Sequence, residues 1–169
     1  MRIETERLYL TELDESMAGD IYRNSQDANV KRFVPDEYFN SEEEVLEKIK
    51  YFKTRYDHID GPVVYPMILK DGNVNIGYVS CFKCDEGYYK IGYHTTLKYT
   101  NKGYATEAIK ALLPILKEKL NLTEVYCNCL DSNKVSRRVA LNCGFVLDFS
   151  GEGNYKGTMR RVKRFVYKF

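Results

Sequence analysis

The sequence has 169 residues, a length that fits one ordinary domain with a core large enough to fold without disulfides. Its 26 basic and 24 acidic side chains leave a formal net charge of +2, which excludes the strong positive field of a protein whose main partner is nucleic acid. It has no leader-like start and no apolar run near the roughly 18 residues of a membrane span, so we expect a cytoplasmic, single-domain protein over residues 1–169, with no membrane partner and five reduced cysteines.

The N-terminal third predicts one strand followed by a pair of helices. Residues 7–13 alternate apolar and polar side chains, as a half-buried strand does, and Asp14 is placed to cap a short helix. Ser41 and Glu44 form a capping box, in which each side chain bonds the backbone N–H of the other. The amphipathic helix that follows has its apolar face formed by Val45, Ile49, Phe52 and Tyr56.

The middle of the chain predicts an antiparallel meander and then a long helix. Residues 63–69, 76–82 and 88–94 alternate with a period of two, and glycine-containing turns separate them. From Gly103 to about Leu120 the apolar residues recur at helical spacing, with a kink expected at Pro114.

The C-terminal part predicts a strand at 124–130, a helix from Asn133 to Cys143 and two further strands. This order of elements favours an α+β fold, a mixed sheet with helices on its faces. The basic segment 156–164 fits an edge strand whose charges protect it from aggregation. An RNA- or ribosome-binding module without catalysis is the alternative reading of the same charges.

One strand-to-helix junction has the pattern of an anion site. Gly103 lies where the backbone amides of a helix start can converge on a ligand without an obstructing side chain, an arrangement that holds a phosphate or pyrophosphate. The loop lacks the Gly-x-Gly-x-x-Gly of dinucleotide folds and the Gly-Lys-Ser/Thr of a P-loop, so NAD and ATP are not expected. An ordinary turn is the alternative interpretation of Gly103.

Three segments resemble the GNAT superfamily of acyl-CoA-dependent N-acetyltransferases. Its pyrophosphate loop, Arg/Gln-x-x-Gly-x-Gly/Ala, is similar to Thr100-Asn101-Lys102-Gly103-Tyr104-Ala105. The continuation to Ala108 and the start Thr5-Glu6-Arg7-Leu8 resemble the RimJ/RimL-type branch, which acetylates ribosomal-protein amino termini, and its relatives that act on small amines and antibiotics. Asn133-x-x-Ser136-x-x-Val139 ahead of Gly144-Phe145 resembles the helix beside the pantetheine arm. The chain departs from the family at Thr100, and Lys102 is a candidate for the missing cation.

The resemblance implies a central, mostly antiparallel sheet that splays between its fourth and fifth strands, with helices on both faces. The main chain of 91–95 and 125–128 would line the splay and orient acetyl-CoA. Side chains or main chain expected to contact this co-substrate belong to Thr95, Thr100, Asn101, Lys102, Gly103, Tyr104, Ala105, Thr106, Asn133 and Ser136.

The implied activity is direct transfer of the acetyl group from acetyl-CoA to a primary amine. A protein N-terminal amine is the first expectation, and a small amine such as a polyamine, an amino acid or an aminoglycoside is the alternative. Relatives occur as monomers and as homodimers, so both states stay open.

Two side chains are candidates for proton transfer. Many relatives use a Tyr where this chain has Ala140, whereas Ser136 matches the serine of the ribosomal-protein branch and is the candidate acid for the departing thiolate. A helix-stabilising hydroxyl is the alternative. His94 ends the strand nearest the expected acceptor and titrates near neutrality, so it is the candidate base, against a packed or solvated histidine. Glu86 and Tyr93 are reserve candidates.

The cysteines and the acidic residues of the helix pair have simpler explanations as well as functional ones. A zinc site from Cys81, Cys84, Cys127 and Cys129 is not expected, because three of the four lie in strand patterns and one pair is spaced too tightly. Cys143 as a nucleophile is set against a core position. The helix pair between Asp14 and Ile59 should form one wall of the acceptor pocket. Its acids, which either attract a cationic amine or are simply solvated, include Asp36, Glu37 and Glu42 to Glu44.

Overall fold

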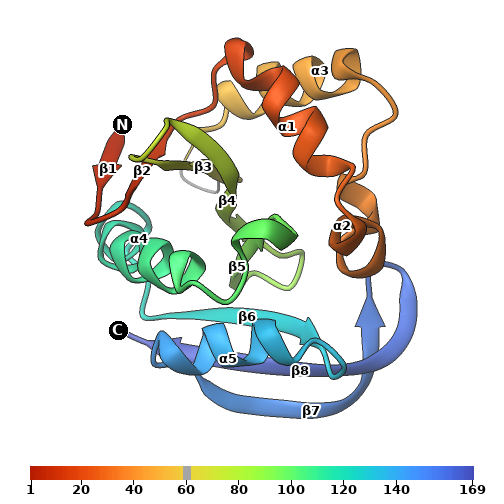
Figure 1. The fold of residues 1–169 in the computed structure, drawn as a ribbon. Coiled ribbons are helices and arrows are strands. Elements are labelled where there is room, and N and C mark those ends of the chain that lie inside the picture. The colour runs from red at the N-terminus through yellow and green to blue at the C-terminus, as the bar shows by residue number, and fades with distance from the viewer. Residues whose placement is uncertain (59–61) are drawn as a thin grey trace.

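The computed structural model describes residues 1–58 and 62–169, so Ile59, the expected end of the helix pair, lies outside the described residues. Within them, eight strands form one sheet in the order β1-β2-β3-β4-β5-β6-β8-β7 (Figure 1). The strands are β1 (Arg2–Glu4), β2 (Leu8–Thr11), β3 (Val63–Leu69), β4 (Val74–Lys83), β5 (Tyr89–Thr95), β6 (Glu124–Leu130), β7 (Val146–Tyr155) and β8 (Thr158–Lys168). The predicted α+β fold is confirmed.

The sheet is antiparallel except where β5 meets β6. These two strands run parallel and, over the described residues, are in register at one position, Lys90 opposite Tyr126. Beyond that position the strands separate, and the main chain of 91–95 that faces β6 has no sheet partner there. The splay expected between the fourth and fifth predicted strands is therefore present, between β5 and β6.

Five α-helices lie in the described residues, and the sequence predicted four of them. They are α1 (Ala18–Ser25), α2 (Ala28–Phe33), α3 (Glu42–Lys53), α4 (Tyr104–Leu120) and α5 (Lys134–Asn142), with short 3-10 turns η1 (Glu15–Met17), η2 (Pro35–Glu37) and η3 (Leu97–Tyr99). α4 runs through Pro114. None of the described helices is long and apolar enough to cross a membrane.

Several expectations were wrong in detail. β1 and α2 were not predicted, and α3 ends before Tyr56, although the Tyr56 ring is buried. The Ser41 hydroxyl accepts from the Glu44 N–H at 3.3 Å as expected, but the Glu44 carboxylate accepts from the N–H of Asn40, at 2.8 Å, and not from Ser41. The capping box is thus closed one residue earlier.

The basic C-terminal segment is not an edge strand. β8 lies between β6 and β7, and β7 forms the edge. Several of the cations are also paired: Lys163 lies 3.2 Å from Asp131, Arg164 lies 2.6 Å from Asp148, and Lys156 contacts Asp36. These ion pairs leave less free positive charge than the sequence suggests.

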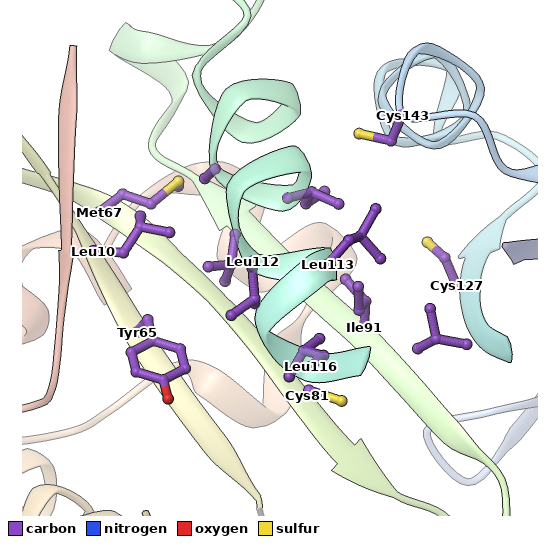
Figure 2. Packing of buried hydrophobic residues seen from close by; sticks show 14 of the residues in the cluster. Leu10, Tyr65, Met67, Cys81, Ile91, Leu112, Leu113, Leu116, Cys127 and Cys143 are labelled. Carbon is purple, nitrogen blue, oxygen red and sulfur yellow. The ribbon is translucent and has the colours of Figure 1, made fainter. Parts of the chain in front are cut away.

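Helices cover both faces of the sheet. α4 packs on one face, where Leu112, Leu113 and Leu116 point toward strand residues that include Leu10, Met67 and Ile91 (Figure 2). A second cluster, formed by α1 and α3, packs around Val64 on the other face of β3. Because neighbouring residues of a strand point to opposite faces, Val63 and Tyr65 belong to the first cluster and Val64 to the second. The candidate functional site lies at the splay between β5 and β6, next to the helices that cover the sheet.

Candidate active site

The junction between η3 and α4 exposes backbone amides. Asn101 and Gly103 have positive φ angles of 59° and 83°, and Gly103 is the N-cap of α4. The first N–H groups of an α-helix have no intrahelical acceptor, and the helix dipole places partial positive charge there. Gly103 has no side-chain oxygen to cap them. An anion such as a diphosphate is the natural partner of this helix start.

The two side chains that flank the loop are engaged elsewhere. The Thr100 hydroxyl donates to the Leu97 carbonyl at 2.8 Å, which closes the η3 turn. Lys102 is exposed, with its ammonium 5.6 Å from the centre of the Tyr99 ring. The loop therefore presents mainly its backbone.

Residues near the N-terminus hydrogen-bond to the loop that precedes α4 and to the first turn of that helix. The Arg7 side chain donates to Glu107 in the first turn of α4 at 2.7 Å and to the Lys102 carbonyl at 3.0 Å. The Thr5 hydroxyl also donates to the Glu107 carboxylate, at 2.6 Å. These hydrogen bonds and the charge of Arg7 hold the pKa of Glu107 below its usual value although burial acts to raise it. The two segments that resemble one GNAT branch in sequence are thus in direct contact.

A cavity of about 810 Å³ extends from this junction across the splay. The predicted site residues that line it are His94, Thr95, Thr100, Asn101, Gly103, Tyr104, Ala105, Thr106, Asn133 and Ser136. Among the described residues predicted for the site, Lys102 lies outside the lining. The exposed Glu86, a reserve candidate, lies in the turn between β4 and β5 and also does not line it. We call this space the cofactor cavity.

Three residues that line the cofactor cavity each have a buried polar atom with no hydrogen-bond partner in the described part of the chain. The atoms are His94 Nε2 and Thr95 Oγ1 on β5, and Asn128 Oδ1 on β6. A buried polar atom without a partner costs free energy, so these atoms are suited to a bound ligand. They come from both sides of the splay.

Ser136 is held by two neighbours. Its backbone N–H donates to the Asn133 side chain at 3.1 Å, which is the predicted cap of α5. Its hydroxyl lies 2.8 Å from the hydroxyl of Tyr93, which also donates to the Ser136 carbonyl at 2.7 Å. Burial raises the pKa of Tyr93 well above its ordinary value, so this hydroxyl stays protonated. Ser136 and Tyr93, candidates from separate parts of the sequence, form one hydrogen-bonded pair.

His94 is a partly buried imidazole beside Tyr78, with 6.2 Å between the ring centres. Burial lowers its pKa below 6.5, and the charge of Asp27 opposes that shift. The ring is therefore neutral at pH 7 and can accept a proton at a nitrogen.

The acetyltransferase (GNAT) domain family matches residues 7–146, well over half of the chain. The chain belongs to the GNAT acetyltransferase family. It is 31% identical over 145 residues to the uncharacterized N-acetyltransferase YnaD of Bacillus subtilis (strain 168), a match that covers 85% of this chain and 82% of YnaD.

Solved GNAT structures share the whole fold. The microcin C7 self-immunity acetyltransferase MccE, solved with acetyl-CoA and AMP, has a TM-score of 0.85 at 18% identity, covering 97% of this chain and 93% of MccE. RimL, the ribosomal L7/L12 alpha-N-protein acetyltransferase solved with coenzyme A, has a TM-score of 0.83 at 17% identity, covering 99% of this chain and 98% of RimL. This chain is accordingly an acyltransferase with a GNAT fold.

The cysteines of this GNAT domain are packed thiols. All five are free, and four of them are buried. Burial raises the pKa of Cys143 to about 11, and the Cys143 thiol contacts the Thr106 carbonyl at 3.7 Å. A thiol with a raised pKa is a poor nucleophile at neutral pH. Within residues 1–58 and 62–169, no three His, Cys, Asp or Glu side chains gather as a metal site requires.

Sequence reasoning gave too little weight to Glu37. It lies at the end of η2, and the Tyr78 hydroxyl of β4 donates to its carboxylate. Burial raises the pKa of Glu37, and this effect outweighs the hydrogen bond from Tyr78 and the charge of Lys156. Glu37 lines the cofactor cavity near His94, whereas Glu42, Glu43 and Glu44 are exposed on α3. The only sequence signal is a short acidic turn that follows Pro35.

Proposed function

We propose that this GNAT domain transfers the acetyl group of acetyl-CoA directly to a primary amine, with a protein N-terminal amine as the first acceptor class. The observation that carries the proposal is the cofactor cavity, which joins the exposed amides after Gly103 to the splay and to Glu37. One end suits a diphosphate and the other suits a cationic or hydrogen-bonding amine.

The chain has groups that fit each part of acetyl-CoA. The amides at the start of α4 would hold the pyrophosphate, because Gly103 leaves the approach free of a side chain. The main chain of β5 at the splay, together with Asn128 and Asn133, would bind the amides of the pantetheine arm. Acetyl-CoA supplies the acetyl group as a thioester, an activated form that needs no further cofactor.

The protein contributes position and proton transfer. The neutral amine nitrogen bonds to the acetyl carbonyl carbon, the carbon–sulfur bond breaks, the nitrogen loses a proton, and the sulfur leaves as a thiolate that gains one. Main-chain N–H groups at the splay would polarise the carbonyl. Each of these contributions depends on the gap between β5 and β6.

Ser136 is the proposed acid. Its pairing with Tyr93 fixes the direction of the hydroxyl within the cavity lining. His94 is the proposed base, because its lowered pKa leaves a neutral nitrogen at pH 7, and its Nε2 has no partner among the residues described. It would take the proton directly or through one water.

The test is release of coenzyme A from acetyl-CoA in the presence of a panel of peptides and small amines. We expect amine-dependent release, with the N-acetylated form of each amine as the matched control because it has no free nitrogen to react. Release that is the same with and without amine contradicts the proposal. A salt-dependent complex with RNA, combined with no thermal response to acetyl-CoA, would instead favour the binding module.

A further inference from the structure

A second cavity of about 400 Å³ adjoins the cofactor cavity. Its lining is largely apolar and is supplied by α1, α3, β3 and β4, with Leu13, Ile21, Phe39, Ile49 and Phe52 among its walls. Six residues line both cavities and form the boundary between them: Asp36, Glu37, Tyr78, Ser80, Phe82 and His94. We call the second cavity the apolar chamber. Nothing in the acetyl transfer described above uses it.

The boundary between the two cavities includes a carboxylate, Glu37, that could pair with an ammonium group. Glu37 is a partly buried carboxylate that accepts a hydrogen bond from Tyr78, and burial raises its pKa and so disfavours its ionised form. A primary ammonium beside it would offset that desolvation. The other ionisable groups that line the chamber are Asp36, already paired with Lys156, the exposed Lys48 and the neutral His94. Glu37 is therefore the acid best placed to hold a single ammonium.

The chamber itself does not match a polar or multiply charged molecule. A polyamine needs several acids along its length, and an aminoglycoside needs hydrogen-bond partners for many hydroxyls. The walls instead offer aliphatic and aromatic surface, which favours an apolar group at about 25 cal/mol for each Å² removed from water. The lining also includes a buried amide: Asn75 is 5% exposed, and its Nδ2 has no hydrogen-bond partner within the described residues. It would suit a carbonyl oxygen.

We propose that the acceptor is a primary amine attached to a compact apolar group, with the amine held at Glu37 and the apolar group in the apolar chamber. This inference rests on the proposed function and narrows its substrate. A peptide whose first residue has an apolar side chain and a free apolar amine share this chemistry. Asn75 favours the peptide, because a carbonyl follows its amino group.

The experiment compares kcat/KM for four acceptors at saturating acetyl-CoA. They are a peptide beginning with Phe, free phenethylamine, spermidine and an aminoglycoside. We expect the two apolar amines to exceed spermidine and the aminoglycoside at least about tenfold, because one buried aromatic group contributes more than the 1.4 kcal/mol of a tenfold ratio. A higher kcat/KM for the peptide than for phenethylamine identifies a peptide, and not a free apolar amine, as the acceptor.

Two variants test the assignment of each part. Glu37→Gln keeps the shape and the bond to Tyr78 but removes the charge, and it should raise the KM for amine about tenfold or more while leaving the KM for acetyl-CoA unchanged. Ile21→Gln places an amide in the chamber. It should lower the ratio of kcat/KM for the apolar amines to kcat/KM for spermidine and the aminoglycoside. Leu141→Gln is the matched control, because Leu141 is an exposed helical residue that lines neither cavity.

The outcomes distinguish a failure of this acceptor assignment from a failure of the proposed acetyltransferase function. Equal or better turnover of spermidine or the aminoglycoside overturns the inference while amine-dependent release of coenzyme A still supports the acetyltransferase. An unchanged apolar-to-polar ratio in Ile21→Gln, with the wild-type thermal response to acetyl-CoA retained, also overturns it. No turnover of any amine contradicts both proposals.

Discussion

Ser136 combines a structural position with a chemical one. Its N–H receives the cap from Asn133, and its hydroxyl is paired with Tyr93 inside the cavity lining. Tyr93 donates to the Ser136 carbonyl, and in the 2.8 Å contact between the two hydroxyls either oxygen can be the donor, so the Ser136 hydrogen is not committed to Tyr93. Tyr93 therefore acts as a positioning residue that holds the serine side chain. The two sequence interpretations of Ser136, acid and structural hydroxyl, are compatible in this geometry.

His94 should set the acid limb of the pH profile. Its pKa in the folded chain is lowered by burial, so kcat/KM for the amine should fall as the pH drops below 6.5, where the imidazole gains a proton. We expect His94→Ala to lose this limb and to lower activity about a hundredfold at pH 8. The measurement is kcat/KM against pH for the wild type and the variant.

The exposed His58→Ala is the control, and it should keep the limb. A limb that persists in His94→Ala would remove this residue from the mechanism.

The pH dependence of stability gives a second test of His94. Since the pKa of His94 is lower in the folded chain, the unfolded chain binds the proton first, and the free energy of unfolding falls as the pH drops below 6.5. His94→Ala should reduce that fall.

Between elements, the contact of the N-terminal segment with α4 is the connection that fixes the cofactor loop. Arg7→Ala removes the ion pair with Glu107 and the bond to the Lys102 carbonyl. We expect the KM for acetyl-CoA to rise about tenfold. The KM for amine should be unchanged, because Arg7 supports the cofactor loop through the Lys102 carbonyl and does not line the apolar chamber. Unfolding free energy should fall by about 1 kcal/mol, since the Arg7 side chain is 41% exposed and solvent screens the pair.

Arg23→Ala is the matched control for this prediction. It removes an ion pair with Asp20 on the surface of α1 and should change neither KM. A rise in both KM values for Arg7→Ala would mean that the segment supports the whole fold and not the cofactor loop in particular.

Periodicity predicted the long elements well and the short ones poorly. The meander, α4, β6 and α5 were found because each has several apolar residues at a constant spacing. β1 has three residues and α2 has six, too few to establish a period. The position of β8 inside the sheet was not predictable from its charges, because β8 pairs with the distant β6 as well as with its hairpin partner β7.

At the scale of the whole molecule, the proposed cofactor loop has a motif in the sequence, whereas on the proposed acceptor side the sequence indicated only the helix pair and its acids, not the apolar chamber. The residues from Thr100 to Thr106 are consecutive, so a motif reveals them. Glu37 meets Tyr78 across 41 positions of chain, and the apolar chamber gathers residues from α1 to β4. Nothing local in the sequence marks such a wall, since each of its residues also fits an ordinary core position.

The same architecture predicts that acetyl-CoA stabilises the whole fold. In Figure 1, β6, α5, β7 and β8 form the lower half of the view, and over the described residues one registered pair joins β5 to β6. A ligand that contacts both β5 and α5 bridges the two halves and binds only the folded chain. At a hundred times its Kd it should raise the free energy of unfolding by about 2.7 kcal/mol. For a chain of this size that corresponds to a Tm increase on the order of 5–10 °C.

Gly103→Val should abolish that increase, because a β-branched side chain is strained at a φ of 83° and its Cβ would lie 3.4 Å from the Arg7 guanidinium, so the loop that presents the amides would have to shift. Gly87→Val is the matched control. Gly87 has a similar φ of 90°, its added Cβ would meet nothing within 4 Å, and it lines neither cavity. Both variants should lose about 1–2 kcal/mol of basal stability from the positive φ, yet Gly87→Val should keep the full response to acetyl-CoA. A wild-type Tm increase in Gly103→Val would show that the helix start does not bind the diphosphate, and would contradict the assignment of this end of the cavity.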